Sequence, residues 1–116
     1  MQLLMILHDA PYGSERAYQA LRLADALLQV EEDLELTVYL TADGVFCAKK
    51  GQATPEGTYN VGRMLKPVLR RGKVMACRMC AEARGLTPED LMEGVLITRL
   101  ADLATLTLEA DKVLVY

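Results

Sequence analysis

Residues 73–85 read Lys73-Val-Met-Ala-Cys77-Arg-Met-Cys80-Ala-Glu-Ala-Arg-Gly85. The apolar run near the start of this segment, which Gly72 precedes, is typical of a short strand that is covered on both faces. Ala81 to Arg84 predict the beginning of a helix, and glycine is the residue type that most often ends one. The segment therefore predicts a strand that passes directly into a helix, with Cys77 and Cys80 at the junction.

The same change of pattern recurs along the rest of the chain. Further strands are expected at 3–7, 34–40, 94–97 and 113–116, with a buried turn as the alternative at 94–97. Further helices are expected at 17–28, 61–69, 100–110 and from Thr87-Pro88 onward. Pro67 lies inside one of these helices and predicts a kink or exposure there. Because strands alternate with helices, we predict an α/β fold of βαβ units in one domain, residues 1–116. The expected architecture is a three-layer sandwich, in which a mainly parallel sheet of about five strands has helices on both faces.

In such sheets, ligand-binding and catalytic groups gather at the carboxyl ends of the strands. The segments 8–14, 41–51 and 77–85 are therefore the regions where a functional site is expected.

The composition limits the possible functions. With 116 residues, of which 52% are hydrophobic, the chain has the size of one domain with a sizeable core. The net charge of −3 excludes a general polyanion-binding surface, so we expect no direct binding of nucleic acid. No apolar run approaches the roughly 18 residues that cross a bilayer, and the first residues do not resemble a signal peptide. Three cysteines do not make a secreted disulfide framework, so we expect a cytoplasmic protein with reduced thiols and no membrane partner.

The Cys77-Arg78-Met79-Cys80 motif is the sharpest chemical feature of the chain. A cysteine at a helix N-terminus faces the positive end of the helix dipole and free backbone N–H groups, and both favour the thiolate. We therefore predict that the pKa of Cys77 is lowered and that Cys77 reacts faster than Cys80 and Cys47. The spacing also allows Cys80 to form a disulfide with Cys77. The alternative is that both cysteines only pack the junction between strand and helix, as free cysteines often do.

Positive charge is concentrated in the middle of the chain. Between Cys47 and Arg84 there are nine basic and two acidic residues, a net charge of +7, whereas the remaining residues have four basic and fourteen acidic side chains, a net charge of −10. Most of these basic side chains are expected on solvated helix faces. Arg78 and Arg84 flank the cysteine motif, and we predict that these two stabilise a thiolate or attract an anionic substrate.

Other kinds of site lack the residues that they need. Structural zinc takes four ligands, and the chain offers one CxxC motif, the distant Cys47 and a single histidine. No serine stands on a nucleophile elbow, and residues 9–13 hold one glycine where a dinucleotide-binding loop has three. We expect neither a metal nor a cofactor. His8 is interpreted as a hydrogen-bonded residue at a strand end, and Cys47 as a buried residue, with the alternative that it faces the same crevice as Cys77.

Several motifs, in their order and spacing, resemble the DsrE/DsrF-like family. Asp43-Gly44-Val45 follows the second expected strand, Cys77 stands eight residues before Gly85, and residues 108–116 read Leu-Glu-Ala-Asp-Lys-Val-Leu-Val-Tyr. The segment Pro11-Tyr-Gly-Ser-Glu15 and the alanine-rich helix after it look similar as well. The resemblance therefore spans nearly the whole chain.

The resemblance implies a small α/β sandwich that assembles as trimers or hexamers. In the sulfur-relay branch of the family, which includes the TusD-type subunits of tRNA thiolation, one cysteine carries a persulfide received from a donor protein. Cys77 occupies the matching position, and Asp43 and Gly44 fall in the implied site. Cys80 departs from the TusD-type pattern, because a second thiol could discharge a persulfide on Cys77 as a disulfide.

Three functions remain open from the sequence. The first is a sulfur-carrier or sulfurtransferase-like protein, in which Cys77 accepts sulfane sulfur as a persulfide from a donor protein and passes it to an acceptor. In that function Arg78 and the helix N-terminus stabilise the anion, and Cys80 resolves the persulfide or protects the nucleophile. The second is a thiol–disulfide oxidoreductase that uses the Cys77/Cys80 pair. The third is a non-catalytic oligomeric binding module, in which the cysteines only pack.

Overall fold

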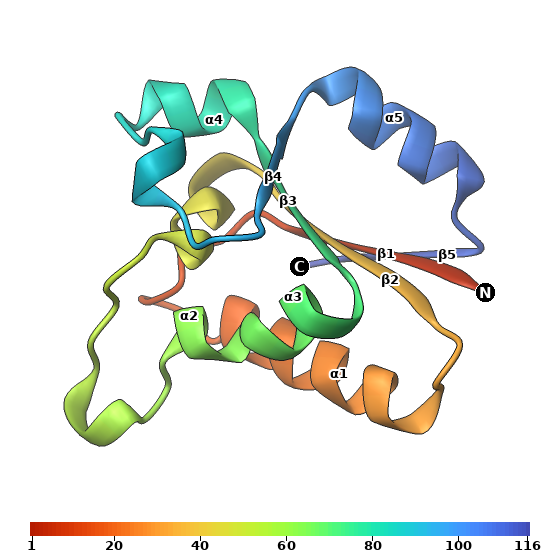
Figure 1. Cartoon of the computed structure of the whole chain (residues 1–116), viewed down its shortest axis with the longest axis horizontal. Helices are drawn as coiled ribbons and strands as arrows, with labels where there is room; N and C mark the ends of the chain where they lie inside the picture. Colours follow the sequence, from red (N-terminus) through yellow and green to blue (C-terminus); the bar gives the residue numbers. More distant parts are fainter.

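Five parallel strands form one sheet in the computed structural model, which describes residues 1–116 (Figure 1). The strands are β1 (Gln2–Leu7), β2 (Glu35–Leu40), β3 (Lys73–Cys77), β4 (Leu96–Thr98) and β5 (Lys112–Val115). Their order across the sheet is β4-β3-β2-β1-β5, and every neighbouring pair is parallel. The prediction of an α/β fold with a parallel five-stranded sheet is confirmed.

The carboxyl ends of the three central strands are level with one another. Leu7 at the end of β1 pairs with Leu40 of β2, and Leu40 pairs with Ala76 of β3. The residues that come next in the chain therefore meet at one edge of the sheet. Thr41 and Cys77 are neighbours at this edge, because each follows directly after the matched pair Leu40 and Ala76.

Helices cover both faces of the sheet, as predicted. The α-helices are α1 (Arg16–Val30), α2 (Val61–Met64), α3 (Lys66–Arg71), α4 (Arg78–Ala83) and α5 (Leu100–Glu109), and the 3₁₀ helices are η1 (Ala42–Ala48), η2 (Pro55–Gly57) and η3 (Pro88–Asp90). Figure 1 shows α1, α2 and α3 on one face, α5 on the other, and α4 beyond the end of β3. The main core lies between the first face and α1, whose apolar stripe is buried at positions Ala17, Ala20, Leu21, Ala24 and Leu28.

The face beneath α5 is covered more thinly. Leu4 and Tyr39 are each only 1% exposed on this side, yet no residue of α5 itself is fully buried. Leu108 of α5 is 88% exposed, and Val115 on the edge strand β5 is 62% exposed. Apolar side chains thus remain in contact with water on this face of the molecule.

Pro67 divides the helix that the sequence predicts at 61–69. The chain forms α2, then a break at Leu65, and then α3, in which Pro67 is the second residue. Proline has no N–H group to donate to the preceding turn, and it is tolerated in the first turn of a helix, where that group has no partner in any case. The predicted kink is confirmed.

The helix predicted from Thr87-Pro88 onward is wrong in its length, because only the single turn η3 forms. The start signal itself is present, since Asp90 and Thr87 make a reciprocal capping box. The turn then ends because the chain pairs with the loop after η1. The backbone N–H of Lys50 donates to the carbonyl of Asp90 (2.8 Å), and Leu91 forms an antiparallel bridge with Lys49.

None of the helices combines the length and the apolar character that crossing a membrane requires.

Candidate functional site

The thiols of Cys77 and Cys80 lie where β3 passes into α4. Cys77 is the last residue of β3 and the N-cap of α4, and its Sγ atom accepts a hydrogen bond from the backbone N–H of Cys80 (3.4 Å). The two Sγ atoms are 2.7 Å apart, and both thiols are free and partly exposed. Because a disulfide bond is about 2.05 Å long, a small rotation of the side chains brings the sulfurs to bonding distance.

The end of β2 forms a second wall of this site. The Oγ1 atom of Thr41 lies 3.4 Å from the Sγ atom of Cys80, and the backbone N–H of Ala42 helps to lower the pKa of the same thiol. Ala42 has a φ angle of 50°, in the left-handed region that residues other than glycine rarely occupy. Such strain is concentrated at functional sites. Here it accompanies an amide that is directed at Cys80.

Arg84 connects the cysteines to the segment after β2. Its Nε atom donates to Asp43 Oδ1 (2.8 Å), and its Nη1 atom donates to the carbonyl oxygen of Cys80 (3.0 Å). The side chain of Arg84 is 27% exposed, whereas that of Asp43 is 60% exposed. The structure therefore brings two of the sequence-predicted residues, Arg84 and Asp43, to the cysteine pair.

Gly44 allows η1 to approach the end of β1. A Cβ atom at this position would overlap the backbone carbonyl oxygen of Leu7, and the N–H of Gly44 donates to the carbonyl of Thr41 (2.8 Å). A side chain here would push η1, and with it Asp43, away from the sheet. Gly44 thus contributes to the site through its missing side chain, which allows the backbone of η1 to pack against the end of β1.

The charges and hydrogen bonds around the two thiols contradict the prediction that Cys77 is the more acidic one. Burial raises the pKa of Cys77, and the coupling to Cys80 adds to this rise. Burial also acts to raise the pKa of Cys80, but hydrogen bonds from Cys77, Thr41 and the Ala42 amide, together with the charge of Arg84, lower it below its ordinary value. The sequence argument counted the helix dipole at Cys77 and missed the donors from β2. The first thiolate of the pair therefore forms at Cys80.

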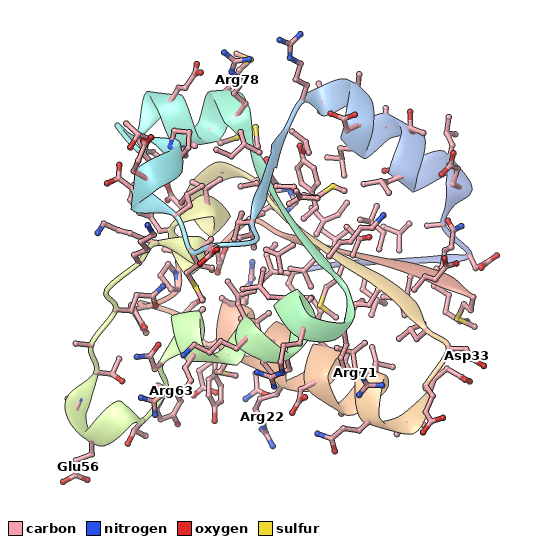
Figure 2. The ribbon with its side chains drawn as sticks, viewed as in Figure 1. Arg22, Asp33, Glu56, Arg63, Arg71 and Arg78 are labelled. Atoms are coloured by element: carbon pink, nitrogen blue, oxygen red, sulfur yellow. The ribbon has the colours of Figure 1, made fainter.

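Arg78 is directed away from the sheet. Its Nε atom pairs with Glu82 Oε1 at 2.9 Å, one turn further along α4, and both side chains are more than half exposed. Figure 2 shows Arg78 on the outer side of α4. The cation that lowers the pKa of Cys80 is Arg84.

Three residues near the cysteines are not singled out by the sequence pattern, although Thr41 and Ala42 lie within the segment 41–51, where a site is expected. Thr41 is implied by strand order, because it follows β2 directly, but its contact depends on the register with β3. Ala42 gives no signal in the sequence, since nothing in an alanine marks a positive φ angle. Tyr39 is hidden inside an apolar run. Its hydroxyl accepts from Thr98 Oγ1 (3.3 Å) and donates to the carbonyl of Arg99 (3.4 Å), and burial raises its pKa, with a further rise from the nearby cysteines.

His8 and Cys47 lie apart from this chemistry. His8 is exposed at the end of β1, where its backbone N–H donates to the carbonyl of Tyr116 (3.0 Å). Cys47 is fully buried in η1 with its Sγ atom 3.7 Å from the carbonyl oxygen of Asp9, and burial raises the pKa of its thiol to about 12. The interpretation of Cys47 as a buried residue is confirmed. No three His, Cys, Asp or Glu side chains come together in a way that would hold a metal ion.

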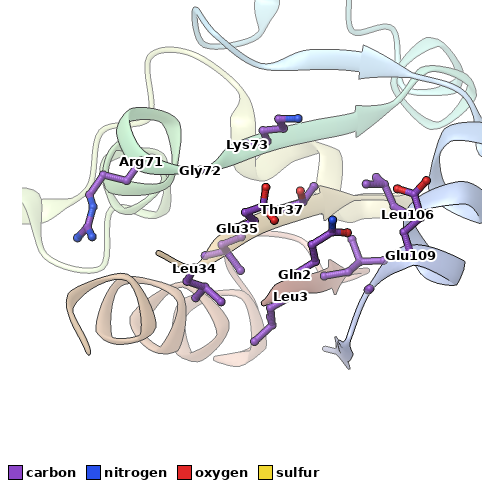
Figure 3. A pocket seen from close by; sticks show the side chains of 13 residues that line it. Gln2, Leu3, Leu34, Glu35, Thr37, Arg71, Gly72, Lys73, Leu106 and Glu109 are labelled. Atoms are coloured by element: carbon purple, nitrogen blue, oxygen red, sulfur yellow. The ribbon is translucent and has the colours of Figure 1, made fainter. Parts of the chain in front are cut away.

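A hollow of about 300 Å³ lies at the opposite end of the sheet, at the amino ends of the strands. Figure 3 shows Glu35 and Thr37 of β2 on one side of it and Leu106 and Glu109 of α5 on the other. Both signs of charge line this hollow, so it favours no charged ligand. The cysteine pair at the carboxyl ends therefore remains the candidate site.

Comparisons with known proteins place the chain in one family. The DsrE/DsrF-like family model matches residues 1–116. The protein YchN of Escherichia coli is 39% identical over 116 residues, which cover 99% of this chain and 98% of YchN. An uncharacterised protein of Methanopyrus kandleri is 41% identical over 113 residues, which cover 97% of this chain and 91% of that protein.

Two solved structures share the fold. The crystal structure of YchN from E. coli superposes with a TM-score of 0.92 over 100% of both chains, with 41% identity in that alignment. A protein of unknown function from Methanobacterium thermoautotrophicum superposes with a TM-score of 0.74 over 99% of this chain and 97% of its own, at 17% identity, and supports the fold alone. With the family model matching its whole length, the chain is a member of the DsrE/DsrF-like family, which is a family of sulfur-relay type.

Proposed function

We propose that this protein is a cytoplasmic sulfur carrier of the sulfurtransferase-like kind, which accepts sulfane sulfur as a persulfide on Cys77. The observation that carries the proposal is the pair of free thiols, with Sγ atoms 2.7 Å apart, at the end of β3 in a member of this family. Its partners are a protein that donates sulfur and a protein that accepts it.

The loading step uses the two thiols in different roles. Cys80 ionises before Cys77, because its pKa is lowered by Cys77, Thr41, the Ala42 amide and Arg84; once ionised, its Sγ atom, 2.7 Å from that of Cys77, accepts the proton of the Cys77 thiol. The Cys77 sulfur then attacks the terminal sulfur of a donor persulfide, R–S–SH. The S–S bond of the donor breaks, a Cys77–S–SH group forms, and the donor leaves as the thiolate R–S⁻. One sulfur atom moves without net oxidation or reduction.

Two outcomes follow from the loaded state. A thiolate of the acceptor protein can attack the terminal sulfur, which transfers it and returns Cys77 as a thiolate. Alternatively, the Cys80 thiolate can attack the Cys77 Sγ atom, which forms the Cys77–Cys80 disulfide and releases HS⁻. The second outcome limits the lifetime of the persulfide when no acceptor is bound.

Mass spectrometry after treatment with a sulfane-sulfur donor tests this proposal. The reduced protein should gain about 32 Da for one added sulfur atom, a reversible modification of a reactive thiol. Cys80→Ser should form the adduct more slowly, because the base is gone, but should retain it for longer, because the resolving thiol is gone as well. Cys77→Ser should not form the adduct. An adduct located on Cys80 by peptide mapping would contradict the assignment of Cys77.

The same thiol distance favours a second candidate function, a thiol–disulfide oxidoreductase. In that case the pair cycles between dithiol and disulfide with a dithiol or disulfide substrate, and no sulfur atom is carried. Alkylation with and without prior treatment with a sulfane-sulfur donor separates the two functions, because only the carrier forms a persulfide, whose alkylated product is about 32 Da heavier than the alkylated thiol and is released by a reductant. If Cys77→Ser leaves the behaviour of the protein unchanged in both assays, the cysteines only pack and the protein is a binding module.

A further inference from the structure

A second hollow, whose lining includes neither Cys77 nor Cys80 nor the residues in contact with them, carries concentrated positive charge. It has a volume of about 440 Å³ and lies between the loop after η1, the helices α2 and α3, and the turn after η3. Its charged lining residues are Lys49, Lys50, Arg63, Lys66 and Glu93. Only two of its eleven lining residues are hydrophobic, Leu69 and Met92. Binding sites for organic ligands are mostly apolar, so this lining indicates a charged ligand.

The positive charges in the hollow are not neutralised by ion pairs. The two ion pairs of the chain join Arg78 to Glu82 and Arg84 to Asp43, and neither involves the hollow. One further acid, Asp90, lies near Lys49 and Lys50. Its carboxylate accepts hydrogen bonds from the backbone N–H (2.7 Å) and the hydroxyl (3.0 Å) of Thr87, which are the main causes of its lowered pKa.

With Asp90 and Glu93 counted against the four cations, the hollow keeps a net charge of +2.

A side-chain amide fixes the floor of the hollow. Gln52 Nε2 donates to the carbonyl oxygens of Cys47 (2.9 Å) and Lys49 (3.0 Å), and its Oε1 accepts from the hydroxyl of Tyr12 (2.6 Å) and the N–H of Gly62 (3.1 Å). A single side chain thus joins the loop that carries Lys49 and Lys50 to the first turn of α2.

Asn60 joins the same two segments a second time. It is only 8% exposed, its Nδ2 donates to the carbonyl of Gln52 (3.0 Å), and its Oδ1 caps α2 by accepting from the N–H of Arg63 (2.9 Å). Gly62 lets Gln52 approach, because a Cβ atom there would lie 3.0 Å from Nε2. The backbones that carry the cations are therefore fixed in place before any ligand binds, which lowers the entropy cost of binding.

We propose that this hollow binds a small multivalent anion of the phosphate class, either free or as the phosphate of a small phosphorylated molecule. Arginine and lysine side chains are the residues that recognise phosphate, through charge-assisted hydrogen bonds. The volume exceeds what one phosphate ion fills, and Leu69 and Met92 offer apolar contact to an attached organic group. A small ligand is favoured over nucleic acid, because the chain is net negative and this basic lining is confined to one hollow.

Isothermal titration calorimetry of the full chain tests the proposal independently of the cysteines. The ligands are inorganic phosphate and adenosine monophosphate, at constant ionic strength, with chloride as the monovalent control. We expect saturable binding of the phosphate ligands, weakened roughly tenfold in Arg63→Gln and Lys66→Gln. Glu93→Gln should bind more tightly, because it removes a negative charge from the lining. Arg70→Gln on α3 removes an exposed cation outside the hollow and should change the affinity less than twofold.

Each result has a defined meaning. Tighter binding of the nucleotide than of phosphate supports a phosphorylated organic ligand, and equal binding supports the free anion. Binding that does not saturate, or an equal loss in Arg63→Gln and Arg70→Gln, would overturn the site. A single-stranded oligonucleotide that binds far more tightly than the mononucleotide would also overturn it, in favour of a nucleic-acid surface.

Discussion

The hydroxyl of Thr41 lies 3.4 Å from the sulfur of Cys80, although 39 residues separate them in the chain. The register between β2 and β3 places them together, since Leu40 pairs with Ala76. The hydroxyl donates to the thiolate, so it helps to make Cys80 the thiol that ionises first.

Replacing Thr41 should therefore slow the reaction of Cys80. We expect Thr41→Val to reduce the rate of iodoacetamide alkylation at pH 7 by roughly tenfold, because a hydrogen bond to a charged group is lost. Thr41→Ser keeps the hydroxyl and should restore most of the rate. Peptide mapping assigns the alkylated residue. A first alkylation at Cys77 in the wild type would contradict the ionisation of Cys80 before Cys77.

Arg84 and Arg78 should differ in their effect on the pKa of Cys80. Arg84→Gln removes the charge beside Cys80 and should raise the pKa of that thiol, so that its alkylation profile moves to higher pH. Arg78→Gln is the matched control, because Arg78 pairs with Glu82 at an exposed position. Equal shifts in the two variants would show that the general charge of the region matters and that the position of Arg84 does not.

Cys47 should make the protein less stable at alkaline pH. Its folded pKa of about 12 lies above the ordinary value of 9.0, so the folded chain keeps a proton that the unfolded chain releases. The stability due to this group is complete below pH 9.0 and is lost as the pH rises toward 12. Between pH 9.0 and 10.5 the wild type should lose about 2 kcal/mol that Cys47→Ala does not lose. Urea unfolding of both proteins at the two pH values measures the difference.

Gly44 should tolerate no side chain. Gly44→Ala places a methyl group against the Leu7 carbonyl and should lower the free energy of unfolding by about 2–4 kcal/mol. Gly85→Ala is the comparison, because Gly85 has open space around it and only its φ angle of 72° is unfavourable. That variant should lose about 1 kcal/mol. If the two variants lose the same amount in urea unfolding, the contact with Leu7 is not tight.

The thin cover over the α5 face leads us to predict a homo-oligomer, and the family resemblance leads us to expect a trimer or a hexamer. Light scattering at micromolar concentration should give a mass that is a multiple of three chains, and a mass near the 12.8 kDa of one chain would contradict the prediction. Leu108→Glu on α5 should dissociate the assembly. Val30→Glu is the control, since Val30 is equally exposed at the end of α1 and lies on the other side of the sheet.

Local patterns in the sequence are sufficient for most of the fold. The strand at 3–7 and the helix stripe from Ala17 to Leu28 are decided by short-range periodicity, and both lie where it predicts. The helix from Thr87 fails because its end depends on Lys49 and Lys50, which are distant in the chain. The signal that starts a helix lies in a few neighbouring residues, whereas the length of this helix is decided by the pairing of its end with a distant segment of the chain.

The candidate site likewise has a part that local sequence predicts and a part that depends on tertiary contacts. Cys77 and Cys80 can be selected from one segment, and Arg84 from its charge. The order in which the two thiols ionise depends on Thr41 and Ala42, which follow the end of β2. It also depends on the positive φ angle of Ala42, which an alanine in the sequence does not predict. Arguments from one helix terminus therefore assign the lower pKa to the wrong sulfur.

The sulfur of Cys77 also caps the N-terminus of α4. A persulfide or a disulfide on this atom changes the acceptor that the N–H of Cys80 meets. Since α4 has only six residues, one altered cap affects a large share of its hydrogen bonds. We therefore predict that the stability of α4 depends on whether Cys77 carries a further sulfur atom. Amide hydrogen exchange at Cys80 should distinguish empty from loaded molecules, and a partner resting on α4 could sense the same difference without touching the sulfur.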